Sequence, residues 1–264
     1  MIVLGIDTAT TATAVGLRLA NGGVAERRDD PPPGEHPGHA TRLLAMVHEL
    51  LRDAGTSWGE LDRVAVGLGP GSFTGLRVGV ATAHGLARSR GLQLVGVSSL
   101  RALALAALTS APSGDAGDRR ARADERAEAI VAVIDARRGE VFAAAYDAGE
   151  DGLPRQLSAP AALAPERLAE LVESVRGDGA GGRRSVSVLG DGAVRYAELL
   201  EGSGLTVAGA DSSLHRVAAG AICELGAWEQ PPAAGSVLPD YLRRPDAELA
   251  LEVAAGASAP GTAA

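Results

Sequence analysis

The sequence predicts an α/β fold of two related lobes, each built on a mixed sheet flanked by helices. The main observation is an internal repeat: an apolar strand ends in Ile-Asp, and a short polar turn leads to a second apolar strand. The pattern occurs in IVLGIDTATTATAVGL and again in IVAVIDARRGEVF, so Asp7 corresponds to Asp135. Each copy is followed later by a strand and a Gly-rich turn, which aligns Gly69 with Gly190. The two halves therefore contain the same elements in the same order.

In the first half, the hairpin and a third strand precede an amphipathic helix, His39–Gly55, with Leu at i, i+3, i+4 spacing. A buried strand, Arg63–Leu68, comes next, and a glycine turn then leads into a helix from Phe73 to Arg88. The half closes with a strand and a helix within Leu94–Leu108, where Ser-Ser-Leu opens the helix.

The second half repeats this order. An amphipathic helix is predicted at Ala164–Gly177, and a strand with its glycine loop at Val186–Ala193. A final strand and helix fall within Val207–Cys223, again with Ser-Ser-Leu opening the helix.

Composition divides the chain further. The segment GDAGDRRARADERAEA is charged and poor in large apolar residues, which is typical of a mobile linker. The predicted units are a partner-binding first lobe at 1–110, a linker at 111–129, a second lobe at 130–228, a C-terminal segment at 229–250 and a disordered tail at 251–264.

The helix after the glycine turn has small residues at every fourth position: Gly75, Gly79, Ala83 and Ala87. An interior Gly costs about 0.5 to 1 kcal/mol relative to Ala, so a close approach must offset it. Three uses of these small residues are open. The N-terminus of the helix could hold a phosphate, the ridge formed by the small residues could pack on the chain's own sheet, or a helix of another subunit could cross the ridge. The pattern favours packing, internal or between subunits, over anion binding.

Charge and composition exclude several classes of protein. With 264 residues, 46% of them apolar, and a net charge of −8, the chain is expected to be soluble and unable to bind nucleic acid unaided. It contains no lysine, which excludes a Walker A lysine and a Schiff-base lysine. Cys223 is alone and lies in an apolar helix, so it is expected to be buried. The start of the sequence lacks a basic leader, and a cytoplasmic location without membrane contact is expected.

The two-lobed order resembles the actin-like ATPase and sugar-kinase architecture, whose hairpin turns hold phosphate and metal in a cleft between the lobes. In this sequence no glycine stands in the first turn, and in the second it comes only after two arginines. The resemblance thus implies an actin-like fold with a weakened nucleotide site. Its candidate residues are Asp7, Thr8, Thr10, Gly69 and Asp135.

A narrower resemblance rests on the segments IDTATTATAVGL, GLGPGSFTGLRVGVATAHGLA, VGVSSLRALA, IDARRGEVF and PDYLR. In this order they resemble the TsaB (YeaZ) family, which takes part in forming threonylcarbamoyladenosine at position 37 of tRNA. The resemblance implies a subunit without catalytic residues that pairs with the catalytic paralogue TsaD, joins the ATPase TsaE and also forms homodimers. It further implies no metal and no tightly bound cofactor, ATP or ADP only within the complex, and tRNA only through the complex.

The family interface is formed by helices of the first lobe, here the helices His39–Arg52 and Phe73–Arg88. The residues expected to contact a partner are His39, Leu43, Met46, Val47, Phe73, Gly75, Leu76, Gly79, Val80 and Ala83. If the glycine ridge faces outward, Gly79→Glu should leave the fold intact and abolish partner binding.

Other interpretations are weaker. A small-molecule kinase or ATPase using Asp7 and Asp135 is the main alternative. His36 and His39 are separated by Pro-Gly, so they are expected to be solvated loop histidines and not a metal pair. Ser72 and Ser98 are placed to cap helices.

Overall fold

The computed structural model describes the chain except at residues 33, 110–128, 180–181, 206, 234 and 244–264. The predicted linker, 111–129, lies outside the described residues apart from Ala129, and the predicted tail, 251–264, lies outside them completely.

The first sheet is mixed, as predicted, with strand order β3-β2-β1-β4-β5. Its strands are β1 (Val3–Asp7), β2 (Thr13–Arg18), β3 (Val24–Asp29), β4 (Arg63–Gly69) and β5 (Gln93–Ser98). The first three strands pair antiparallel, whereas β4 and β5 run parallel to β1.

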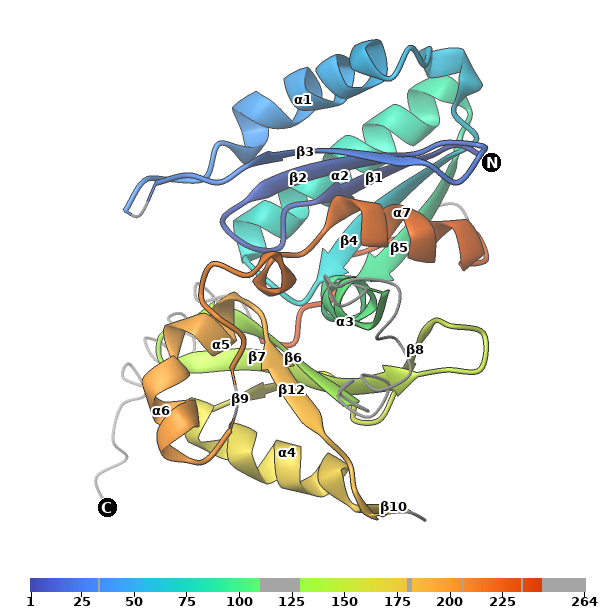
Figure 1. Ribbon diagram of the computed structural model, residues 1–264. Helices are drawn as coiled ribbons and strands as arrows, with labels where there is room; N and C mark the ends of the chain where they lie inside the picture. Colours follow the sequence, from blue (N-terminus) through green and yellow to red (C-terminus); the bar gives the residue numbers. More distant parts are fainter. Residues whose placement is uncertain (33, 110–128, 180–181, 206, 234, 244–264) are drawn as a thin grey trace, which may run out of the picture.

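Two helices cover one face of this sheet, α1 (His39–Asp53) and α2 (Phe73–Arg90) (Figure 1). Local signals set the ends of α2: the Ser72 hydroxyl accepts a hydrogen bond from the Gly75 N–H at 3.4 Å, and Gly91 ends the helix with a left-handed φ of 65°. The predicted capping by Ser72 is confirmed, and so is that by Ser98, whose hydroxyl accepts from the Arg101 N–H at 3.3 Å.

The second sheet has the order β12-β6-β7-β8, with β9 also paired to β7. Its strands are β6 (Ala129–Arg137), β7 (Glu140–Ala148), β8 (Pro154–Gln156), β9 (Ala161–Leu163) and β12 (Val186–Leu189). The hairpin β6–β7 is antiparallel and β12 runs parallel to β6, which matches β1, β2 and β4. A parallel bridge between Val188 of β12 and Val207 corresponds in the second sheet to the pairing of β4 with β5 in the first. The predicted repeat is therefore confirmed.

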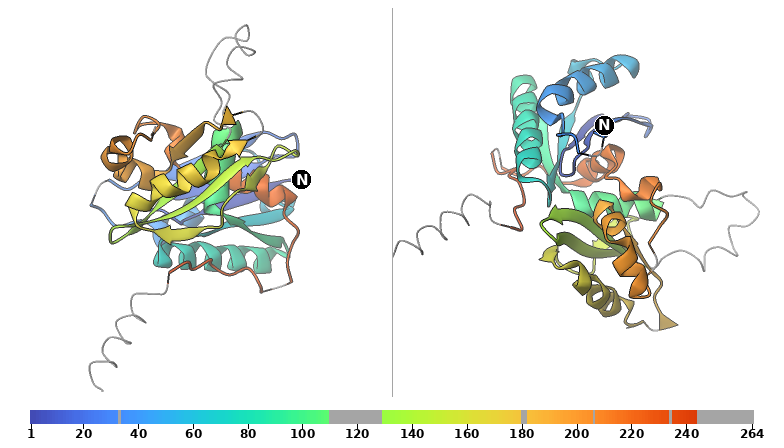
Figure 2. Two further views of the ribbon diagram at one scale, coloured as in Figure 1. Left: turned by 90° about the horizontal axis from the view of Figure 1, so that it is seen from below. Right: turned by 90° about the vertical axis from the view of Figure 1, so that its left-hand side faces the viewer.

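In each half of the chain, one helix packs against the sheet of the other half. Helix α3 (Ser99–Thr109) packs on β6 and β7, and α7 (Ala219–Trp228) packs on β1 and β2. The two helices touch each other and form a layer between the sheets (Figures 1 and 2). One hydrophobic cluster fills this middle layer, and two others lie under the outer helices of each lobe. The lobes thus share a core.

Shorter elements complete the second lobe. Helix α4 (Leu168–Arg176) covers the outer face of its sheet, preceded by a 3₁₀ turn at Pro165–Arg167. The other elements are α5 (Asp191–Arg195), α6 (Ala197–Gly202) and the ribbon of β10 (Asp178–Gly179) and β11 (Gly182–Arg183).

One predicted helix start is wrong. In the second half, Ser-Ser-Leu opens only a 3₁₀ turn, Ser213–His215, and α7 begins at Ala219. The backbone is extended at Arg216 and Ala218, which interrupts the helix. Among the helices in the described part of the chain, none is long and apolar enough to cross a membrane.

Candidate functional site

The glycine side of α2 lies against the chain's own first sheet. Gly75 and Gly79 are buried, and the Thr8 hydroxyl just beyond β1 donates a hydrogen bond to the Gly75 carbonyl oxygen at 2.7 Å. A Cβ at Gly79 would overlap Thr8 Oγ1, and a Cβ at Gly75 would overlap the Thr8 carbonyl oxygen. The expectation of an outward ridge, with Gly79→Glu leaving the fold intact, is therefore wrong. The small residues serve internal packing.

Most of the residues expected to contact a partner are in the core. Nine of them are buried between the helices and the sheet: His39, Leu43, Met46, Val47, Gly75, Leu76, Gly79, Val80 and Ala83. Phe73 is half-buried. The apolar spacing that suggested an interface marks the face of each helix that turns toward the sheet. These nine residues can position an interface but do not present side chains to it.

His39 also corrects a sequence-based expectation, since it is only 5% exposed and not a solvated loop residue. Its Nδ1 lies 2.9 Å from the Thr13 hydroxyl oxygen. Desolvation lowers the pKa of His39, so the imidazole is held neutral beneath the first turn of α2. His36, by contrast, is exposed.

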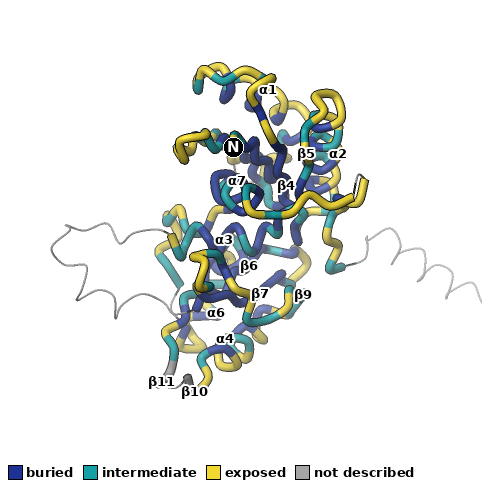
Figure 3. Tube along the Cα trace, turned by 90° about the vertical axis from the view of Figure 1, so that its right-hand side faces the viewer, coloured by how far each residue is buried: buried dark blue, intermediate teal, exposed yellow. Residues whose placement is uncertain are grey.

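The side of α1 that faces away from the sheet is exposed along much of the helix (Figure 3). Its exposed residues from Ala40 to His48 are Ala40, Thr41, Arg42, Leu44, Ala45 and His48. Leu44 is the large apolar side chain of this surface and is 54% exposed.

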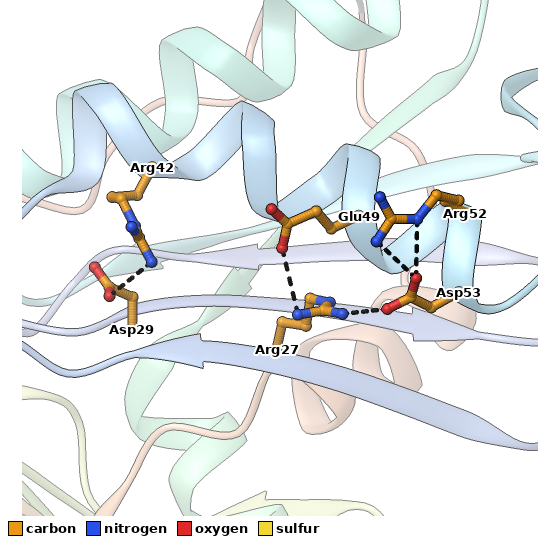
Figure 4. A network of polar contacts seen from close by, with 6 residues as sticks. All are labelled: Arg27, Asp29, Arg42, Glu49, Arg52 and Asp53. Carbon is orange, nitrogen blue, oxygen red and sulfur yellow. Dashed lines mark hydrogen bonds and ion pairs between the residues drawn. The ribbon is translucent and has the colours of Figure 1, made fainter.

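Three charged residues of α1, Arg42, Glu49 and Asp53, form ion pairs with residues of β3 (Figure 4). Arg27 of β3 forms ion pairs with Glu49, at 3.3 Å, and with Asp53. Nearer the start of the helix, Arg42 pairs with Asp29 at 3.4 Å. These pairs fix the helix along the sheet edge and hold the charged ends of Arg42 and Glu49 against β3.

Helix α2 presents small and basic residues outward. It contains no acidic residue, and its exposed positions are Thr74, Arg77, Ala81, Gly85, Arg88, Ser89 and Arg90. A Cβ at Gly85 would meet no atom within 4 Å. We call the exposed residues of α1 and α2 together the outer helical face.

A cavity of about 430 Å³ lies between the lobes. It is bordered by the turn after β1, the turn before α2, the β6–β7 turn, Asp191 and the C-terminal residues 240–243. Asp135 and Thr10 are among its lining residues, whereas Asp7, Thr8 and Gly69 are not. The structure therefore brings only two of the five candidate nucleotide-site residues into the cleft.

Asp7 is turned into the first lobe. It is 1% exposed, and its carboxylate accepts hydrogen bonds from the Ser99 hydroxyl at 2.6 Å and the Ala9 N–H at 3.0 Å. Burial raises the pKa of the Asp7 carboxyl above its usual value. Any side chain at Gly67 would overlap Asp7 Oδ2, so this glycine leaves the space for the carboxylate. Asp7 thus connects the end of β1 to α3.

Asp135 occupies the equivalent hairpin position and does face the cleft. Arg137 and Arg195 lie 3.4 and 3.5 Å from its carboxylate, and its N–H donates to Asp191 Oδ1 at 3.0 Å. Burial raises the pKa of Asp191, and the nearby Asp135 adds to the effect. Within the described residues, no group of three or more His, Cys, Asp or Glu could hold a metal ion.

Two backbone donors at the N-terminus of α2 form hydrogen bonds within the chain. The Ser72 N–H donates to the Ala9 carbonyl oxygen at 2.7 Å, and the Gly75 N–H is used by the cap. Two features of the cleft were missed from the sequence: Asp191 and the C-terminal residues. The Gly190-Asp191-Gly192 loop and the PDYLR motif were the available signals.

Comparison with known proteins places this geometry in a family. Residues 32–193 match the family model described as TsaD, tRNA N6-adenosine threonylcarbamoyltransferase. The tRNA threonylcarbamoyladenosine biosynthesis protein TsaB of Escherichia coli is 36% identical over 178 residues, which are 67% of this chain and 69% of that protein. The Bacillus subtilis protein of the same name is 28% identical over 258 residues, covering 94% and 96% of the two chains.

A solved structure from Pseudomonas aeruginosa, an uncharacterized protein with similarity to peptidase YEAZ, aligns with a TM-score of 0.68 at 31% identity. The alignment covers 92% of this chain and 99% of that one. The mixed sheets, the repeat and the actin-like order of elements agree with the resemblance drawn from the sequence. The chain belongs to the TsaB (YeaZ) family.

Proposed function

We propose that the chain is a non-catalytic subunit in the formation of threonylcarbamoyladenosine at position 37 of tRNA. It binds a TsaD-like catalytic paralogue, and a TsaE-like ATPase joins this pair in the cytoplasm. The observation that carries the proposal is membership of the TsaB family, whose E. coli and B. subtilis members are named for this biosynthesis.

The outer helical face is the proposed binding surface for the paralogue. It exposes Leu44, and Arg42 and Glu49 of α1 are held in ion pairs with residues of β3. Residues 32–193, which match the TsaD model, include both helices. A related partner can therefore present an equivalent helix pair, and the same geometry permits a homodimer.

The placement of polar residues supports a subunit that acts by binding. A kinase using Asp7 would need this carboxylate in the cleft, but Ser99 and the Ala9 N–H hold it inside the lobe. A peptidase using Cys223 would need a reactive thiolate, yet the thiol is buried and its pKa is raised. ATP or ADP and tRNA would then be bound by the complex and not by this chain alone.

The test is reconstitution with the paralogue and the ATPase of the same organism. Modified nucleoside in tRNA is measured by mass spectrometry, with each protein omitted in turn. Modification should require this chain together with the paralogue, and this chain alone should produce none. Modification by this chain without the paralogue, or an unchanged yield without this chain, would refute the proposal.

A further inference from the structure

A segment after α7 runs back along α2. We call residues Val237–Arg243 the C-terminal strap. Val237 is 4% exposed and packs into the core of the first lobe, and its carbonyl oxygen lies 2.8 Å from His84 Nε2 of α2. The Asp240 N–H donates to the Leu68 carbonyl oxygen of β4 at 2.8 Å. The strap thus lies beside α2 in the same layer (Figure 2, left).

The far end of the strap is fixed by aromatic and charged contacts. The Tyr241 and Phe73 rings are 4.9 Å apart, and the Arg77 guanidinium lies 3.7 Å from the centre of the Phe73 ring. Arg77 Nε also donates to the Tyr241 hydroxyl at 3.1 Å. Arg243 then pairs with Glu140 of β7 at 2.7 Å. The strap is therefore an ordered part of the surface that spans both lobes.

The exposed residues of the strap are Leu238, Asp240 and Tyr241, so two of its three exposed side chains are large and largely apolar. Leu238 directly follows the buried Val237 and is 65% exposed. Tyr241 is 40% exposed. With Leu44 on α1, three of the large apolar side chains that the described residues expose belong to α1 and the strap, the two elements on either side of α2.

We propose that the C-terminal strap is a third element of the surface that binds the TsaD-like paralogue, with Leu238 as an apolar contact. The inference rests on the proposed function, and it follows from the continuity of the strap with the outer helical face. Helix α2 between them presents small residues such as Ala81 and Gly85, so a flat partner can reach Leu44 and Leu238 together. Large apolar side chains that become buried at the centre of an interface carry much of its binding energy.

The strap also lies outside residues 32–193, the part of the chain that matches the TsaD model. The helix pair can be common to both partners, whereas the strap is contributed by this chain beyond the matched region. A contact through Leu238 therefore adds to what the shared helices provide.

The experiment introduces the same charged residue at an exposed apolar position on each of two sides of the first lobe. Leu238→Glu is expected to weaken binding of the paralogue by at least about tenfold, measured by calorimetry on the full chain. The matched control is Trp228→Glu, because Trp228 is 66% exposed and lies at the end of α7 on the opposite face of the sheet. The control should bind within about twofold of the wild type. Thermal melting of each variant should match the wild type, and Leu238→Ser should also bind more weakly without adding charge.

A third variant, Leu44→Glu, separates the two proposals. If Leu44→Glu weakens binding and both Leu238 variants bind normally, the strap is not part of the interface, but the outer helical face is still supported as the binding surface. If all three bind normally, the proposed surface is wrong altogether. Equal weakening by Trp228→Glu and Leu238→Glu would also overturn the inference, because the effect would then come from charge alone.

Discussion

Gly79→Ala should destabilise the chain, although the same change at an exposed helical position is stabilising. Helix propensity alone would stabilise α2 by about 0.5 to 1 kcal/mol. However, the new methyl group would overlap Thr8 Oγ1, which is buried and engaged with the Gly75 carbonyl oxygen. Overpacking in a filled core costs about 1 to 3 kcal/mol, and loss of the Thr8 hydrogen bond adds about 1 kcal/mol. The net expected loss is about 2 kcal/mol of unfolding free energy.

The matched control lies on the same helix. A Cβ at Gly85 would meet nothing within 4 Å, so Gly85→Ala should stabilise the chain by about 0.5 to 1 kcal/mol. Urea denaturation of the two variants and the wild type measures the free energy of unfolding, and so shows which change stabilises the chain and which destabilises it. Combining Gly79→Ala with Thr8→Ala should recover part of the loss, since the overlapping oxygen is then removed. Equal stabilisation by Gly79→Ala and Gly85→Ala would refute the close packing of α2 on β1.

Three further predictions concern charged and reactive groups. Burial raises the folded-state pKa of the Asp7 carboxyl above 3.8, so the folded chain binds a proton at this carboxyl more tightly than the unfolded chain does. The free energy of unfolding should therefore fall as the pH rises from 3.8 through the folded-state pKa. Asp7→Asn removes this contribution, so the variant should gain unfolding free energy relative to the wild type over that range; a constant difference would contradict the buried carboxyl. The Cys223 thiol should react with an aromatic disulfide reagent only after unfolding, and rapid labelling in native buffer would argue against its burial. Arg27→Ala removes two exposed ion pairs and should cost less than about 1 kcal/mol in urea denaturation, whereas a loss above about 2 kcal/mol would show that solvent does not screen them.

The elements that could be predicted were those with strong local signals. The start of α2 at Phe73 follows from the Ser72 cap, and the equivalence of Asp7 and Asp135 follows from two hairpins with the same pattern. The exchange of α3 and α7 between the sheets could not be predicted. Helix α7 is apolar on nearly all sides, so its pattern carries no information about which sheet it covers.

The candidate site was harder to predict because it depends on which way side chains turn. The spacing of Gly79 and Ala83 identified a ridge of small residues, but a ridge has the same spacing whether it faces a partner or a sheet. Only Thr8, distant in sequence, decides between these two arrangements. Likewise, the repeat placed Asp7 at the cleft end of β1, while Ser99 of α3 turns its carboxylate inward.

The same contacts explain why the outer surface, and not the cleft, carries the proposed function. In the first lobe, the two turns that border the cleft bond to each other: the Ser72 N–H donates to the Ala9 carbonyl oxygen, and a Cβ at Gly71 would overlap that oxygen. Two backbone donors at this end of α2 are thus used within the first lobe: the Ser72 N–H joins the helix to the β1–β2 hairpin, and the Gly75 N–H bonds to the Ser72 hydroxyl. Substitutions at these turns should therefore act through folding stability, whereas substitutions at Leu44 should act through partner binding with the melting transition unchanged.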